Sequence, residues 1–167
     1  MTEERPANVV HEDAVPATDE LSGSFSHRRQ RLSAAAGGRR LGCSRYELPP
    51  HGRSFPFHYH LANEEAVYVL SGEGTLRLGE RTVAIGPGDY VALRAEAGHA
   101  HQLVAGADAP LVYLCVSRMR EPDVCIYPDS DKLGVFAGTA PGGDTAARTL
   151  CEFVGRSPRL PYLHGEE

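Results

Sequence analysis

The segment from Gly52 to Gly72 reads GRSFPFHYHLANEEAVYVLSG and contains two histidines one residue apart, followed by a glutamate. His58 and His60 precede a short loop, and Glu65 stands at the start of a β-rich run. Side chains alternate between the two faces of a β-strand, so both imidazoles of an extended pair point to one side. A carboxylate that opens the next strand can converge on the same point. The spacing therefore predicts a metal-binding group.

A second pair of histidines, His99 and His101, follows about forty residues later. Three imidazoles and one carboxylate suit Fe, Mn, Ni, Cu or Zn, whereas Mg and Ca prefer sites made of oxygen alone. We therefore predict one divalent transition-metal ion held by His58, His60, Glu65 and one histidine of the second pair. The competing interpretation is that these histidines are surface or packed polar residues without a metal.

These residues resemble the first motif of the cupin superfamily, which is Gly, five residues, His, one residue, His, three or four residues, Glu, six residues and Gly. The motif fits without gaps on Gly52, His58, His60, Glu65 and Gly72. Glu64, one position earlier, is the alternative carboxylate. The chain is most similar to small single-domain bacterial cupins of the conserved-barrel type, whose role is mostly unassigned. The resemblance implies an all-β double-stranded β-helix, or jelly-roll barrel.

The second cupin motif is less regular in this chain. Arg94 and Glu96 stand where the motif has proline and glycine, and the strict spacing would make His99 the ligand. The run after it is similar to a cupin subgroup whose ligand loop is two residues longer, with Ala105 in place of the usual asparagine. That register favours His101 as the fourth ligand and leaves His99 as a supporting residue or an alternative ligand.

The chain divides into three parts by composition. Residues 1–27 are acidic and aperiodic, which predicts a flexible N-terminal arm or a strand ordered only on a partner. Residues 28–118 form the predicted barrel, and 119–167 a C-terminal extension that wraps the barrel or a dimer partner. Short runs between turn residues predict the barrel strands, at 41–48, 55–60, 66–70, 75–78, 82–85, 90–93, 101–104 and 111–116. We expect a short helix at 145–154.

Composition limits the classes of function. The chain has 167 residues and a mass of 18.0 kDa, enough for one domain. A net charge of −5 and a pI near 5.9 argue against a nucleic-acid partner. The one concentration of basic residues is interpreted as solvated charge or as salt bridges to a second subunit, and contains Arg28, Arg29, Arg31, Arg39 and Arg40.

Other sequence features concern location and assembly. No apolar run approaches the roughly 20 residues that span a bilayer, and no signal peptide is recognised, so we expect a cytoplasmic protein without membrane contact. Four widely spaced cysteines predict reduced thiols, with Cys43 and Cys115 as small core residues. An arm and a tail that cover sheet edges favour a homodimer.

The resemblance leaves the function open between classes. The first is a metalloenzyme of dioxygenase, isomerase or decarboxylase type, acting on a small oxygenated molecule at an open metal site in the barrel. Its catalytic residues are unassigned, with Glu96, His99 and the tyrosines Tyr68 and Tyr113 as candidate acid or base groups. The second is a non-catalytic binding or sensor protein that uses the metal to hold its ligand. The third is a structural role with a vestigial site.

Overall fold

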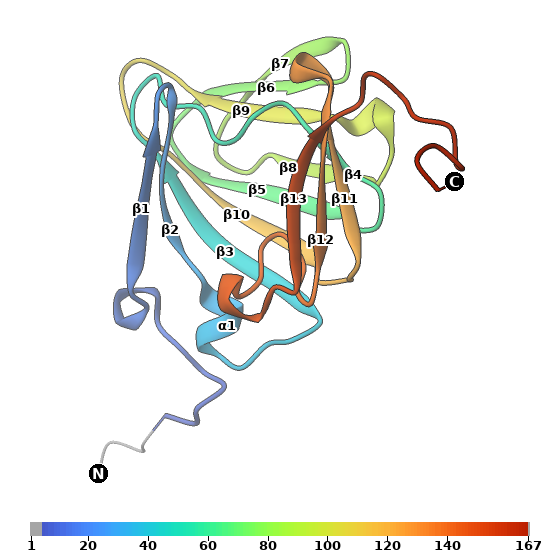
Figure 1. Ribbon diagram of the computed structural model, residues 1–167. Coiled ribbons are helices and arrows are strands. Elements are labelled where there is room, and N and C mark those ends of the chain that lie inside the picture. The colour runs from blue at the N-terminus through green and yellow to red at the C-terminus, as the bar shows by residue number, and fades with distance from the viewer. Residues whose placement is uncertain (1–4, 167) are drawn as a thin grey trace.

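Antiparallel β-strands are the main regular structure of the chain (Figure 1). The computed structural model describes residues 5–166. Its largest sheet has the strand order β1–β2–β3–β10–β5–β8. The strands of this sheet are β1 (Ala17–Ser22), β2 (Phe25–Gln30), β3 (Leu41–Leu48), β10 (Leu111–Arg118), β5 (Glu65–Ser71) and β8 (Tyr90–Leu93). This sheet forms one wall of the barrel.

A four-stranded sheet supplies the opposite wall, and a three-stranded sheet closes one end (Figure 1). The four-stranded sheet contains β13 (Leu150–Gly155), β12 (Lys132–Ala137), β11 (Asp123–Tyr127) and β4 (Tyr59–His60). The three-stranded sheet contains β7 (Arg81–Ile85), β6 (Gly74–Leu78) and β9 (His101–Ala105). The described helical segments are short: the α-helix α1 (Leu32–Ala35) and four 3₁₀ turns, Glu12–Ala14, Ala97–His99, Pro128–Ser130 and Thr145–Ala147.

The hydrophobic core lies between these sheets because alternate residues of each strand turn inward. On β3, Ser44, Tyr46 and Leu48 are buried, and their neighbours are less so. Tyr46 stacks on Tyr113 of β10 with ring centroids 5.3 Å apart. Each large apolar side chain buried in this way contributes about 1.5–3 kcal/mol to folding. The core cluster consists of Tyr46, Leu48, Val67, Val69, Leu76, Ile85, Leu93, Leu103, Ala105, Leu111 and Tyr113.

The turn after β5 explains why the last position of the predicted motif is a glycine. Gly72 has a φ of +76°, which side-chain-bearing residues rarely adopt. A Cβ atom at this position would lie 2.0 Å from the Pro110 carbonyl oxygen, at the start of β10. Only glycine allows β5 and β10 to approach in this way.

The all-β jelly-roll prediction is confirmed, and most predicted barrel strands are present within a residue or two of their expected ends. The predicted strand at 55–60 is reduced to the two residues of β4. The helix expected at 145–154 is wrong. Only Thr145–Ala147 forms a 3₁₀ turn, and 150–155 form β13, because each of its residues pairs with β12.

The chain ends differ from the sequence expectation. Order was expected near Arg28, but β1 and β2 form a hairpin over 17–30, and Arg28, Arg29 and Gln30 pair with β3. Paired backbone groups thus order much of the segment expected to be a flexible arm, of which residues 1–4 lie outside the described part. After residue 118, β11, β12 and β13 build a wall of the barrel. Within the described residues, no helix is long and apolar enough to cross a membrane.

Candidate metal centre

The backbone brings the two predicted histidine pairs side by side. His60 lies on β4, and Glu65 is the first residue of β5. His58, just before β4, pairs with His101 at the start of β9 through two backbone hydrogen bonds. The His58 amide donates to the His101 carbonyl at 3.2 Å, and the His101 amide to the His58 carbonyl at 2.8 Å. The two pairs therefore meet through an antiparallel bridge.

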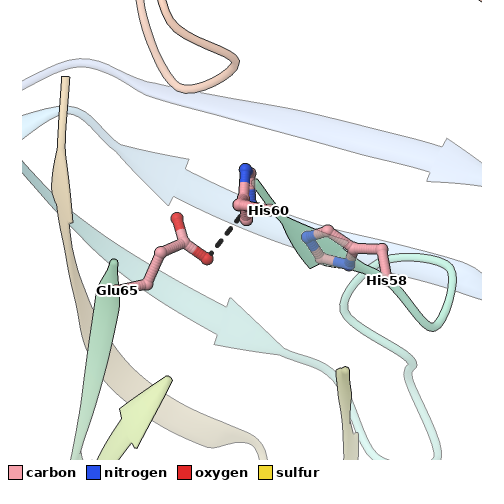
Figure 2. A group of neighbouring side chains, drawn as sticks. All are labelled: His58, His60 and Glu65. Carbon is pink, nitrogen blue, oxygen red and sulfur yellow. Dashed lines mark ion pairs between the residues drawn. The ribbon is translucent and has the colours of Figure 1, made fainter. Parts of the chain in front are cut away.

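Four predicted side chains converge on a small volume inside the barrel. Figure 2 shows Glu65 pointing toward His60, with His58 beside it. One oxygen of Glu65, Oε2, lies 3.4 Å from His60 Nε2 and 3.5 Å from His101 Nε2. The candidate ligand atoms of His58, His60 and Glu65 all lie within 4.8 Å of one another. The rings of His58 and His101 have centroids 4.7 Å apart.

Hydrogen bonds at the far nitrogen orient each imidazole. His58 Nδ1 lies 2.8 Å from the Pro56 carbonyl, and His101 Nδ1 lies 3.0 Å from the His99 carbonyl. A carbonyl oxygen can only accept, so both Nδ1 atoms carry the proton and both Nε2 atoms keep their lone pair. Metal-binding histidines are commonly held by such a bond. The donor set therefore fits a transition metal.

His60 is held by a buried carboxylate instead of a carbonyl. Its Nδ1 donates to Asp123 Oδ2 at 2.6 Å, and the Asp123 side chain is fully buried. Asp123 also accepts hydrogen bonds from Asn63 Nδ2 at 2.8 Å and from the Ala62 amide at 2.9 Å. Asn63 in turn exchanges two hydrogen bonds with the Arg120 backbone. This network fixes the His60 ring between two carboxylates.

The electrostatics of the cluster differ from one histidine to the next. Burial, reinforced by the neighbouring His101 and His60, lowers the pKa of His58 to about 3. Burial alone would lower the pKa of His60, but Glu65 and Asp123 raise it well above 6.5. Burial would raise the pKa of Glu65, yet His60 and His101 hold it well below its ordinary value. In the metal-free protein, His60 and Glu65 thus form an ion pair that a cation would replace.

The alternative residues point elsewhere. Both ring nitrogens of His99 contact Arg94, at 3.2 Å each, and Nδ1 also lies 3.1 Å from the Ala92 carbonyl. His99 therefore supports His101 through its backbone carbonyl, while its ring is engaged outside the group. Glu64 is exposed, and no contact within the described residues joins its side chain to the cluster.

The candidate acid and base residues from the sequence differ in whether they reach the cavity next to the metal group. Glu96 is half-exposed and pairs with Arg94 at 2.7 Å, and neither it nor His99 lines the cavity next to the metal group. Tyr68 is exposed, whereas Tyr113 is buried and lines that cavity. Of these candidates, only Tyr113 can meet a molecule bound beside the cluster.

A second group of potential ligands lies directly behind the first. Cys125 Sγ is 3.3 Å from His60 Nδ1, and Asp123 completes the group. Burial raises the pKa of the Cys125 thiol, which therefore keeps its proton at neutral pH. The same nitrogen of His60 already donates to Asp123. This group therefore orients His60 and leaves the Nε2 side for a metal.

The cluster opens into a cavity of about 510 Å³ between the two main sheets. Three tyrosines and three arginines contribute polar groups to its lining, namely Tyr46, Tyr113, Tyr127, Arg29, Arg31 and Arg148. The sequence interpretation of Arg29 and Arg31 as solvated surface charge is therefore wrong. Both side chains are partly buried and face this cavity, because β2 joins the main sheet.

Sequence reasoning also missed Asp123, Asn63 and Arg148. Asp123 lies in the predicted C-terminal extension, just after the predicted barrel, and Asn63 lies inside the first motif. The sequence gives the positions of both residues but not their function. The hydrogen bonds that define this function join residues about sixty positions apart. Nothing in the sequence around Arg148 points to the cavity.

Comparison with known proteins agrees with this architecture. Residues 44–117 match the family model described as Cupin domain. No curated protein matches the chain significantly.

Solved structures extend the likeness to nearly the whole chain. A protein from Acidithiobacillus ferrooxidans, assigned provisionally as a sugar phosphate isomerase, aligns with a TM-score of 0.78 at 24% identity, covering 93% of this chain and 96% of its own. A sugar phosphate isomerase from Silicibacter pomeroyi gives 0.76 at 22%, with coverages of 90% and 94%. A polyketide cyclase from Streptomyces resistomycificus gives 0.56 at 28%, with coverages of 69% and 82%.

Proposed function

We propose that this protein, which belongs to the cupin superfamily through its central domain, binds one divalent transition-metal ion and acts as a metalloenzyme on a small oxygenated molecule. His58, His60, Glu65 and His101 would hold the ion. The observation that carries the proposal is the convergence of Glu65 with the Nε2 sides of three oriented histidines at the wall of a cavity.

The ion would supply Lewis-acid polarisation of a substrate oxygen or, if it is iron, activation of O2. Four protein ligands leave positions free on a six-coordinate metal, and the cavity gives a small molecule access to them. The phenols of Tyr46 and Tyr127 are largely buried, which raises the pKa of each well above its ordinary value. These groups stay protonated at neutral pH and can donate hydrogen bonds to oxygen atoms of the bound molecule.

Among dioxygenase, isomerase and decarboxylase chemistry, we take isomerisation of a sugar phosphate as the first reaction to test. Two structural neighbours that span at least 90% of this chain carry that assignment. Their identity to this chain is below 25%, so the likeness concerns the fold, and the choice of reaction is ours.

One observation favours the non-catalytic alternative. The phenols and thiols that line the cavity all hold their protons, since burial raises the pKa of Tyr113, Cys115 and Cys125 as well. A reaction that removes a proton from carbon needs a base with a pKa near neutrality. Among the described lining residues, the carboxylate besides Glu65 is Glu20, which lies 3.4 Å from His27. A wall made mostly of hydrogen-bond donors suits a protein that binds its ligand without turnover.

The test is elemental analysis of untagged protein purified without added metal, followed by turnover assays. We expect close to one transition-metal ion per chain, and conversion of an aldose phosphate to a ketose phosphate observed by NMR. Absence of metal, even after incubation with Fe, Mn, Ni, Zn and Cu salts, would contradict the metal site. Tight metal binding with no turnover across aldose and ketose phosphates would select the binding function instead.

A further inference from the structure

Two arginines, one on β2 and one just after its end, donate to the same backbone oxygen at the cavity wall. Arg29 Nη2 donates to the Gly142 carbonyl at 2.9 Å, and Arg31 Nη2 donates to the same oxygen at 3.2 Å. The two residues are two positions apart, so an extended backbone sends both side chains to one face. Arg29 Nε also donates to Ser44 Oγ at 3.1 Å, so both positive charges meet only neutral acceptors among the described residues.

A third arginine reaches the same cavity from the other end of the chain. Arg148 donates through Nη2 to the Pro141 carbonyl, while its Nε is buried without any hydrogen-bond partner. A buried donor left unpaired costs about 1–3 kcal/mol. Pro141 and Gly142, which accept from the three guanidinium groups, are adjacent residues of one loop. The loop therefore gathers the three cations.

No carboxylate neutralises these cations within residues 5–166. Arginine–carboxylate pairs within 4.0 Å involve Arg45, Arg77, Arg94 and Arg156, but not the three cavity arginines. Glu20 lines the same cavity, but its carboxylate lies 3.4 Å from His27 and forms no ion pair with any of the three arginines. Like charges that are brought together without a counter-charge repel each other, and partial burial strengthens the repulsion. A chain with a net charge of −5 has ample carboxylates, yet none is used here.

The three arginines and the metal group line one cavity, on different strands of its walls. Arg29 on β2 and Glu65 on β5 are separated by β3 and β10. Arg29 stands in register with Val69, four positions along β5 from Glu65. At about 4.8 Å per strand and about 3.3 Å per residue, their backbones are roughly 20 Å apart, and both side chains reach inward to shorten that distance. Aromatic rings connect the two ends, since Tyr46 lies 5.4 Å from the Arg29 guanidinium and 5.7 Å from Phe55, which contacts His58. A molecule of a few carbons can span this gap.

We propose that Arg29, Arg31 and Arg148 form the binding site for the phosphate group of a phosphomonoester whose other end reaches the metal group. A phosphomonoester carries close to two negative charges and three acceptor oxygens, which matches several guanidinium groups better than a single carboxylate does. The assignment of the other end rests on the proposed function. The arginine site itself does not require a metal.

Inorganic phosphate is the probe, titrated into the full chain by calorimetry at constant ionic strength, both as purified and after chelator treatment. We expect saturable binding in both samples. Arg29→Met and Arg31→Met should each weaken it by roughly 10-fold or more, the loss of one or two charge-assisted hydrogen bonds. Arg28→Met is the matched control, because Arg28 is exposed on the opposite face of the same strand and should leave the affinity within about twofold.

Several outcomes would overturn the phosphate site. The site would be rejected if the wild type bound phosphate without saturation, or if Arg28→Met lost as much phosphate affinity as Arg29→Met and Arg31→Met. It would also be rejected if acetate bound as tightly as phosphate. Binding that disappears with the metal and ignores the arginines would also reject it. If Arg29→Met fails to fold by circular dichroism, Arg31→Met and Arg29→Lys decide, because Arg29→Lys keeps the charge and should retain part of the affinity. A protein that takes up none of the tested metal ions, yet binds phosphate through these arginines, would refute the proposed metalloenzyme and leave this site standing.

Discussion

The central segment, residues 44–117, and the two flanking segments contribute different things to one cavity. The central segment supplies the four candidate metal ligands, close together at the base of the barrel. The flanks supply Asp123, which orients His60, and the three arginines that face the same space. Under the two proposals above, the central segment would carry the metal chemistry, while the flanks would select the molecule that is held against it.

The largest expected effect comes from the central segment alone. His58→Ala removes a candidate ligand whose Nε2 is free, so bound metal should fall from about one ion per chain to a trace. Elemental analysis of the purified variant checks this. His164→Ala, at an exposed histidine near the C-terminus, is the control and should keep its metal. Full retention in His58→Ala would remove the basis for a centre in the central segment.

Acidification should empty the same site reversibly. Each histidine ligand must be neutral to bind, and the raised pKa of His60 means that protons compete there at a higher pH than at an ordinary histidine near 6.5. Metal bound at neutral pH should therefore be released as the pH falls through the histidine range, with little left below about pH 5. Equilibrium dialysis against buffers of decreasing pH measures it. Metal content that stays constant well below that pH would rule out these ligands.

The two histidines of the second pair should behave differently. His101→Ala removes a ring that faces Glu65 at 3.5 Å, and we expect most of the bound metal to be lost. His99→Ala removes a ring engaged by Arg94, and should leave metal content nearly unchanged because the His99 backbone carbonyl remains. Elemental analysis of the two purified variants measures the difference in metal content. Equal retention would contradict the choice of His101.

The contribution of the flank to the metal centre is tested by Asp123→Asn. An amide nitrogen in place of Oδ2 would face the donors of His60 and Asn63, so the orientation of His60 should be lost. Removing such a supporting carboxylate typically lowers metal affinity by about 10- to 100-fold. Competition with a chromogenic chelator measures the change. If affinity matched the wild type, the flank would have no role in the centre.

The smallest effect is expected where a flank meets the central segment at the surface. Arg77 of β6 and Asp129 form a two-point ion pair at 2.6 and 2.9 Å, and both side chains are about half-exposed. Such pairs are screened by water, so Asp129→Asn should lower the free energy of unfolding by less than about 1 kcal/mol. Denaturant titration measures this. The variant also serves as the control for Asp123→Asn, with unchanged metal affinity.

The central segment was predictable from the sequence, because its information is local. The spacing of His58, His60 and Glu65 is set by strand alternation and one short loop, and Gly72 is required by a positive φ. The choice of His101 over His99 agrees with the side that each ring faces, although the ligand assignment itself stays a prediction.

The flanks were not predictable, because their roles depend on distant pairing. The hairpin of β1 and β2 is mostly polar, so it lacks the apolar alternation by which strands are recognised. β13 is exposed along its length, and its segment was interpreted as a helix for the same reason. Arg29 and Arg31 are brought to the cavity only when β2 pairs with β3 and the loop at Gly142 accepts their hydrogen bonds. The homodimer stays a prediction.

The order in which the strands occur along the chain has a consequence for biosynthesis. β3 pairs with β10, which follows it by more than sixty positions, and the loop that gathers the arginines comes later still. A ribosome therefore releases the histidines of the barrel before the sheet that shelters them can close. Contacts this distant in sequence form slowly. The cavity is complete only when the last strands have been made, so a nascent chain that meets a metal ion early must hold it without Asp123, the carboxylate that keeps His60 in place.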